Sequence, residues 1–305
     1  MNRRLFGRNV AGTLFAGLAI EPASRTLLAD AQETRKPGAS FDISVMLWTV
    51  FRDLPFETRL EKVAAAGYKN VELVGEYSKW SESDFDRANA KRKELGITFD
   101  CTAGLKHSLC NPAERDDLVA ELRRTVPIME KLECPAIIFL SGNTVPGMSV
   151  EAQQQSCVDG LRAAAAVIDG KKISGKPVRL LLENIDPEEN PKYFLTSVAR
   201  GFDIVRAVQH PQVQFLYDFF HEQISEGNLI EKLEKNIEHV GLVHVADVPG
   251  RHEPGTGEIN YKNIFRKLAE LNYRNMVAME FLPSGDPISQ LREAREMALA
   301  IGRTA

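Results

Sequence analysis

The sequence predicts a single-domain α/β protein, a (β/α)8 TIM barrel formed by residues 41–305. Eight short aliphatic runs recur along the chain, and segments with helical spacing of apolar residues separate them. The length of this region is close to the roughly 250 residues of a TIM barrel. No glycine lies in the segment 46–52 that ends the first run, which disfavours the doubly wound fold that binds dinucleotides.

Eight strands are expected in chain order. They cover residues 42–48, 70–74, 97–103, 135–141, 178–184, 213–218, 240–246 and 276–281. Several are continuous apolar runs without alternation, which is typical of parallel strands buried on both faces and disfavours an antiparallel sandwich. Helical spacing follows the first strand at Leu60 and Val63, and the third strand at Leu118 and Leu122. Each intervening segment is long enough to cross back over a sheet.

The amino-terminal segment differs from the rest of the chain. Arg3 and Arg4 precede a short apolar run that ends near Ile20, and Ala29-Asp30-Ala31 offers a small-x-small cleavage site that would release residues 1–31. This pattern predicts a twin-arginine signal and export to the periplasm, the alternative being an amino-terminal extension of a cytoplasmic protein. The apolar run is too short to span a bilayer, so no membrane span is expected in the mature chain. Residues 32–40 are polar and rich in helix breakers, as in a linker.

The charge composition of the chain disfavours nucleic acid as a binding partner. The chain has 38 Lys and Arg against 42 Asp and Glu, a net charge of −4, and no long basic run, so nucleic-acid binding is disfavoured. A small-molecule substrate is expected instead, and a homo-oligomer stays compatible with the sequence. The four cysteines have no CxxC spacing, and we interpret them as ordinary buried or partly buried thiols.

Four polar residues close strands that are otherwise apolar: Glu183, Asp218, His244 and Glu280. In a TIM barrel the carboxyl ends of the strands form the active site. Isolated charges there would be costly to desolvate, whereas three carboxylates and an imidazole around one divalent cation satisfy one another. This donor set favours Mn²⁺ or Mg²⁺, with Co²⁺ or Zn²⁺ as alternatives. The sequence therefore predicts a metal site.

Three segments resemble the hydroxypyruvate isomerase family of the xylose-isomerase-like barrels. They are Leu181-Leu-Glu-Asn184, Tyr217-Asp-Phe-Phe-His221 and the longer run from His244 to Tyr261, and the resemblance extends over residues 41–302. It implies that Glu183, Asp218, His244 and Glu280 bind one divalent metal, and that the two glutamates are the catalytic acid and base. The chain departs from part of this family at one position. Some hydroxypyruvate isomerases have Gln where this chain has His244, whereas 3-epimerases have His there.

Other residues are candidates for substrate binding. The resemblance implies that the imidazole of His221 contacts a substrate oxygen, and the guanidinium of Arg251 could bind a carboxylate through two hydrogen bonds. His252 is a candidate neighbour of the metal, with a plain loop residue as the alternative. Candidate pocket walls, each of which could equally be ordinary packing, are Trp48, Phe51, Trp80 and His107.

The function expected from these residues is a metal-dependent isomerisation of hydroxypyruvate to tartronate semialdehyde, or of a similar keto acid or sugar. A cation would stabilise the enediolate while Glu183 and Glu280 move the proton. A ketose 3-epimerase is the first alternative, because it would use the same four ligands. A sugar-binding barrel without activity and a nuclease related to endonuclease IV are weaker alternatives, the latter because that chemistry needs more histidines than the six present.

Overall fold

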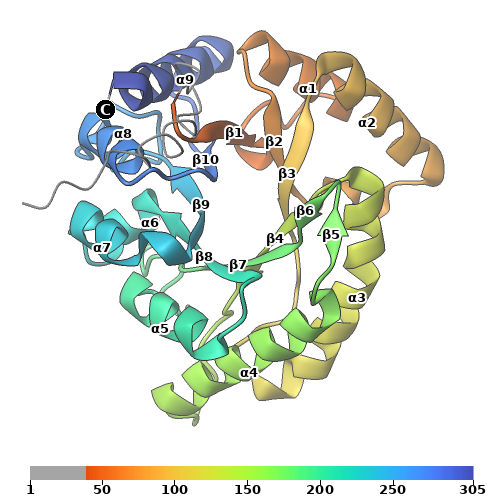
Figure 1. The fold of residues 1–305 in the computed structure, drawn as a ribbon, viewed down its shortest axis with the longest axis vertical. Coiled ribbons are helices and arrows are strands. Elements are labelled where there is room, and N and C mark those ends of the chain that lie inside the picture. The colour runs from red at the N-terminus through yellow and green to blue at the C-terminus, as the bar shows by residue number, and fades with distance from the viewer. Residues whose placement is uncertain (1–38, 305) are drawn as a thin grey trace, which may run out of the picture. The chain divides into compact units, whose positions relative to one another are not determined.

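The computed structural model describes residues 39–304, and within them the chain forms a closed barrel of eight parallel strands (Figure 1). The predicted signal, residues 1–31, and residues 32–38 of the predicted linker lie outside the described residues. The strands adjoin in the order β1-β10-β9-β8-β7-β4-β3-β2. They are β1 (Asp42–Met46), β2 (Asn70–Val74), β3 (Thr98–Ala103), β4 (Ala136–Leu140), β7 (Arg179–Glu183), β8 (Val213–Asp218), β9 (Val240–Val245) and β10 (Met276–Met279). All eight predicted strands are confirmed, each to within about two residues.

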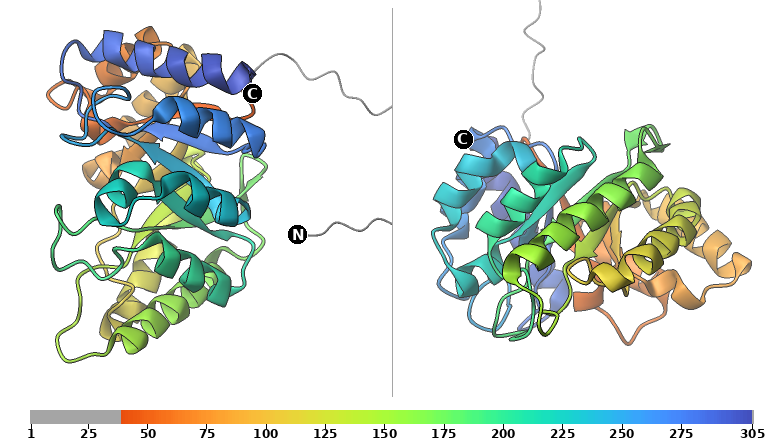
Figure 2. Two further views of the ribbon diagram at one scale, coloured as in Figure 1. Left: turned by 90° about the vertical axis from the view of Figure 1, so that its left-hand side faces the viewer. Right: turned by 90° about the horizontal axis from the view of Figure 1, so that it is seen from below.

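Helices form the outer ring of the barrel, as the side views show (Figure 2). They are α1 (Phe56–Ala65), α2 (Glu82–Leu95), α3 (Arg115–Leu132), α4 (Val150–Ile168), α5 (Val198–Val208), α6 (Phe219–Ser225), α7 (Leu229–Asn236), α8 (Tyr261–Glu270) and α9 (Pro287–Thr304). Local sequence sets several boundaries. Helix α2, for example, begins after a capping box between Ser81 and Asp84 and ends at Gly96, which has a left-handed conformation (φ 67°) that glycine adopts without strain.

One element was not predicted. A short antiparallel hairpin, β5 (Lys172–Ile173) and β6 (Lys176–Pro177), lies between α4 and β7. Its strands have two residues each, too few to show a hydrophobic pattern. The polar turn between them, Ser174-Gly175, is the only local signal in the sequence.

Two layers of apolar side chains hold the barrel together. The larger layer packs between strands and helices, and a smaller one groups Met46, Cys101, Ala136, Ile138, Leu181, Leu216, Leu242 and Ala278. Residues two apart on a strand share a face, so the smaller layer lies directly beneath the side chains at the strand ends. The four predicted metal ligands each follow a member of this layer by two positions: Leu181, Leu216, Leu242 and Ala278. The interior layer therefore supports the predicted site.

Two further predictions concern the whole described region. All four cysteines are buried and unpaired, in agreement with the sequence interpretation. Among the helices of the described residues, none combines the length and apolar character needed to cross a membrane.

Candidate active site and metal centre

The four polar strand-end residues come together at one point of the barrel. Glu183 ends β7, Asp218 ends β8, His244 lies in β9, and Glu280 follows β10 directly. Each offers one ligand atom, and these atoms all lie within 4.8 Å of one another. All four residues are buried, with 6% or less of their surface exposed. The parallel register explains the convergence, because Asp218 pairs with His244 across neighbouring strands.

The chemistry of this cluster fits a divalent cation. Asp218 Oδ2, His244 Nδ1 and Glu280 Oε2 are buried and make no hydrogen bond, although Glu280 Oε2 lies in ion-pair contact with His244 Nδ1 at 2.6 Å and with Arg251 Nη2 at 2.9 Å. Buried polar atoms without partners are rare and costly. A cation held by the three carboxylates and the imidazole would satisfy all of these atoms. Oxygen and nitrogen donors, without a thiolate, match the ligand preferences of Mn²⁺ and Mg²⁺.

The two glutamates differ in electrostatic environment. Burial raises the pKa of Glu183. Burial also acts to raise the pKa of Glu280, but Arg251 and His244 outweigh it and hold that pKa well below its usual range. Trp48 contributes to the same effect, because its indole Nε1 donates a hydrogen bond of 2.8 Å to Glu280 Oε1. Two carboxylates a few ångströms apart thus favour different protonation states.

A fifth carboxylate, Glu72 of β2, orients the histidine. His244 Nε2 lies 2.9 Å from Glu72 Oε2, and both side chains are buried. With Nε2–H donated to Glu72, the Nδ1 atom of His244 is left free to face the other ligands. Such a carboxylate partner fixes the ring and tautomer of a metal-binding histidine. Sequence reasoning missed Glu72, although a charged residue within the apolar run Asn70-Val-Glu-Leu-Val74 is the same signal that identified the four ligands.

His221 is held in place by two aspartates. Its Nδ1 lies 2.6 Å from Asp186 Oδ2 and its Nε2 lies 3.4 Å from Asp218 Oδ2. Burial acts to lower the pKa of His221, but these two carboxylates raise it to about 9. Asp186 is itself fixed, because its Oδ1 accepts hydrogen bonds from the backbone N–H groups of Glu188 and Glu189. Sequence reasoning did not find Asp186, which lies in a loop without a recognisable pattern.

Arg251 lies against the ligand cluster. Its Nη2 is 2.9 Å from Glu280 Oε2, its Nη1 is 2.6 Å from Glu189 Oε1, and its Nε donates to the Glu280 carbonyl. The central carbon of the guanidinium lies over the rings of Trp48 and Phe220, at 5.4 and 4.9 Å from their centroids. It has more N–H donors than these contacts use, so it can still bind a substrate.

The loop that carries Arg251 is folded around one buried carboxylate. Asp247 accepts hydrogen bonds from the backbone N–H groups of Val248, Gly255, Gly257 and Ile259. These amides are therefore engaged with the protein. The glycines of the 255–257 segment serve this turn, since a Cβ on Gly257 would lie 2.0 Å from the Val248 carbonyl oxygen.

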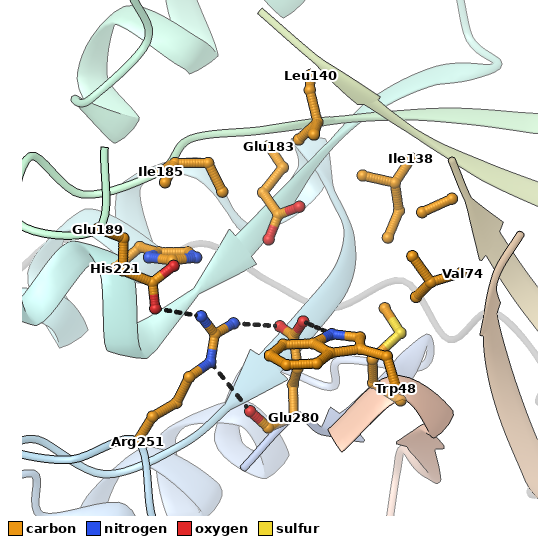
Figure 3. A pocket seen from close by; sticks show the side chains of 12 residues that line it. Trp48, Val74, Ile138, Leu140, Glu183, Ile185, Glu189, His221, Arg251 and Glu280 are labelled. Carbon is orange, nitrogen blue, oxygen red and sulfur yellow. Dashed lines mark hydrogen bonds and ion pairs between the residues drawn. The ribbon is translucent and has the colours of Figure 1, made fainter. Parts of the chain in front are cut away.

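A pocket of about 190 Å³ opens beside the cluster (Figure 3). Of the sequence-predicted residues, Trp48, Glu183, His221, Arg251 and Glu280 line it. The remaining predicted ligands, Asp218 and His244, lie behind this lining, within the cluster described above.

The other candidates lie elsewhere. His107 pairs with Glu121, His252 Nδ1 lies 2.7 Å from the Leu282 carbonyl oxygen, and neither lines the pocket. Trp80 packs edge-on against Phe56 and Phe85, and Phe51 packs against the apolar core. These four side chains serve the packing and loop structure around the barrel mouth.

Comparison with known proteins agrees with this architecture. The family model described as Xylose isomerase-like TIM barrel matches residues 60–301. The chain belongs to this family. Within it, the chain is 30% identical over 250 residues to a 2-oxo-tetronate isomerase from Haemophilus influenzae, covering 80% of this chain and 95% of that protein. It is 27% identical over 259 residues to hydroxypyruvate isomerase from Escherichia coli, covering 82% and 96%.

A similar solved structure is titled as an AP endonuclease, family 2, from Brucella melitensis. Its TM-score is 0.73 at 26% identity, and the match covers 82% of this chain and 96% of that one. The family resemblance noted in the sequence is thus confirmed over most of the barrel.

Proposed function

We propose that the protein is a metal-dependent isomerase that interconverts a small 2-oxo acid, such as hydroxypyruvate, with its hydroxy-aldehyde or hydroxy-ketone isomer. The observation that carries this proposal is the convergence of Glu183, Asp218, His244 and Glu280 beside a small pocket into which both glutamates point (Figure 3). The names of the relatives support it, since both are isomerases of such acids.

The four ligands would hold one divalent ion, Mn²⁺ or Mg²⁺. When bound, such an ion would act as a Lewis acid that polarises the substrate carbonyl and makes the adjacent C–H group more acidic. Glu183 and Glu280 then transfer the proton: one removes it from the hydroxyl-bearing carbon, and the other delivers a proton to the former carbonyl carbon. The hydroxyl proton moves to the former carbonyl oxygen. Atoms and electrons balance without a co-reactant.

The remaining side chains position the substrate. Arg251 is the one guanidinium of the pocket lining, it carries unused N–H donors, and it would bind the carboxylate of a 2-oxo acid. His221, fixed by Asp186, offers a second donor at the same side of the pocket. The fold closes the site from below with the apolar layer of the barrel interior, which keeps water from the reacting carbons.

The decisive experiment measures where the enzyme exchanges hydrogen with solvent. Purified protein is incubated in D₂O with Mn²⁺ or Mg²⁺ and with either hydroxypyruvate or neutral ketoses, and proton NMR locates the deuterium. Exchange at the hydroxyl-bearing carbon of hydroxypyruvate supports the proposal. Exchange confined to C3 of the ketoses would instead identify a 3-epimerase. Metal analysis should find about one divalent ion per chain, and a chain that neither holds nor responds to such ions would overturn the metal site.

A substitution tests the carboxylate interaction. Lysine at Arg251 keeps the charge but loses the planar fork, so Arg251→Lys should lower kcat/KM for hydroxypyruvate by at least about tenfold. Activity on any neutral ketose should fall much less. Equal losses on both substrate classes would show that Arg251 acts through Glu280 and Glu189, which it contacts, and not through the substrate.

We also propose that residues 1–31 direct export through the twin-arginine route. A reporter fused to this segment should leave the cytoplasm, and replacing both Arg3 and Arg4 by Lys should retain it there. A wild-type fusion that stays in the cytoplasm would contradict the proposal.

A further inference from the structure

The pocket has two chemically different walls. The ionisable residues of its lining all lie at or after the ends of β7 to β10: Glu183, Glu189, His221, Arg251 and Glu280. Ile185 lies on the same side, and the indole of Trp48, which follows β1, donates a hydrogen bond to Glu280 between the two walls. The opposite wall is formed at the ends of β1 to β4 by Met46, Val74, Ala103, Ile138 and Leu140. These five side chains carry no oxygen or nitrogen. Figure 3 shows the separation, with Val74, Ile138 and Leu140 on one side and Arg251, His221 and Glu189 on the other.

Two side chains of this apolar wall are exposed to solvent. Among the described residues, four large hydrophobic side chains are exposed: Leu54, Val74, Leu140 and Val150. Two of them, Val74 at 37% and Leu140 at 39%, lie in the pocket lining. A single exposed apolar residue is ordinary, but two together beside a buried polar cluster indicate a surface that an apolar group covers.

The position of the reacting groups determines which part of the substrate meets this wall. Arg251 lies on the polar side, and the reacting carbons must lie between Glu183 and Glu280. A 2-oxo acid held by its carboxylate at Arg251 therefore extends its far end, the substituent on C3, toward Val74, Ile138 and Leu140. A hydroxyl group placed there would lose its hydrogen bonds to water without gaining any from these side chains.

We propose that the substrate is a 3-hydroxy-2-oxo acid whose substituent on C3 is a short apolar group. This inference rests on the function proposed above and specifies its substrate. The pocket, at about 190 Å³, is smaller than the roughly 300–1,000 Å³ of sites for drug-sized ligands, so the substituent has only a few carbons. The reaction moves the C3 proton to C2 and the O3 proton to O2, giving a 2-hydroxy-3-oxo acid without a co-reactant.

The test compares two substrates of nearly equal shape. In 3-hydroxy-2-oxopentanoate the C3 substituent is ethyl, and in 3,4-dihydroxy-2-oxobutanoate it is hydroxymethyl, so a methyl group replaces a hydroxyl group. With the metal-loaded enzyme, kcat/KM from solvent-deuterium exchange at C3 should be at least about tenfold higher for the ethyl compound. Equal values, or a preference for hydroxymethyl, would overturn the proposal. Absence of exchange with hydroxypyruvate as well would instead overturn the proposed function.

Substitutions in the apolar wall test whether its side chains determine the preference for the ethyl compound. Val74→Thr adds a hydroxyl group with almost no change of shape, and Leu140→Gln adds an amide, so the double variant should reduce the ethyl-to-hydroxymethyl ratio severalfold. Val150→Thr is the matched control, because Val150 is equally apolar, is 45% exposed and does not line the pocket. Circular dichroism and thermal melting check that each variant folds. A ratio that Val150→Thr shifts as much as the double variant does would contradict a role for the wall.

Discussion

The two halves of the barrel mouth carry out different tasks. The half formed by β7 to β10 contributes all four candidate ligands, together with Arg251 and His221. The half formed by β1 to β4 contributes apolar side chains to the pocket, and two of its residues reach across to the ligands: the indole of Trp48 donates to Glu280, and the buried carboxylate of Glu72 contacts His244. The difference indicates that chemistry and substrate shape are set by separate strands.

The largest expected effect is in the β7 to β10 half. Glu183→Gln and Glu280→Gln keep the size of each side chain but remove its ability to accept a proton, so each should lower the rate of exchange by about 10²-fold or more. The measurement is deuterium exchange at saturating metal. Glu188→Gln serves as the control, since Glu188 is an exposed acid of the loop that follows Glu183. A near wild-type rate in either variant would leave that glutamate with a ligand role alone.

The next largest effect is expected from a substitution at the contact between Glu72 and His244, which joins the two halves. In Glu72→Gln the partner of His244 Nε2 becomes a weaker acceptor, so metal affinity should fall by about 10–100-fold. Isothermal titration calorimetry with Mn²⁺ measures the change directly, and excess metal should restore part of the activity. Glu222→Gln is the control, because Glu222 is another buried carboxylate, which pairs with Lys232 and not with His244. If both variants bind Mn²⁺ as the wild type does, Glu72 contributes only to packing.

These two halves also differ in how well the sequence predicted them. Glu183, Asp218, His244 and Glu280 each close an apolar strand, and parallel strands bring their carboxyl ends together, so the cluster could be predicted without coordinates. The apolar wall could not, because Val74 and Leu140 look like ordinary strand residues until their exposure is known. For His107 and His252 the sequence leaves open both a pocket role and a plain packing or loop role. They follow strands at plausible positions, but their side chains bond to Glu121 and to the Leu282 backbone. Loop geometry decides such cases, and it carries little periodic signal.

The smallest expected effect concerns stability in the β1 to β4 half. Asp100 lies at a register shift between β2 and β3, where its Oδ1 accepts a 2.6 Å hydrogen bond from Ser44 Oγ and its Oδ2 makes no hydrogen bond. Burial and the neighbouring Glu72 together raise the pKa of Asp100 to about 8, although the hydrogen bond from Ser44 and the charge of Arg179 oppose the change. An unfolded aspartate releases its proton near pH 3.9, about four units lower.

The difference between the folded and unfolded pKa values of Asp100 determines how stability changes with pH. Between about pH 4 and pH 8 the folded protein retains the Asp100 proton that the unfolded chain has lost, so raising the pH across this window favours unfolding. Asp100→Asn is neutral at every pH and lacks this dependence. Its unfolding free energy should therefore improve relative to wild type as the pH rises from 5 to 8. A change of about 1 kcal/mol would shift Tm by roughly 2–4 °C.

The experiment compares thermal melts of both proteins across this pH range, with a chelator present so that pH-dependent metal binding does not contribute. Asp53→Asn, at an exposed aspartate of the loop before α1, is the control and should track the wild type. A difference between Asp100→Asn and wild type that stays constant from pH 5 to 8 would mean that Asp100 is ionised in the folded barrel. The barrel interior beneath the apolar wall would then carry a charged carboxylate, so the apolar character of this half would be limited to the pocket surface.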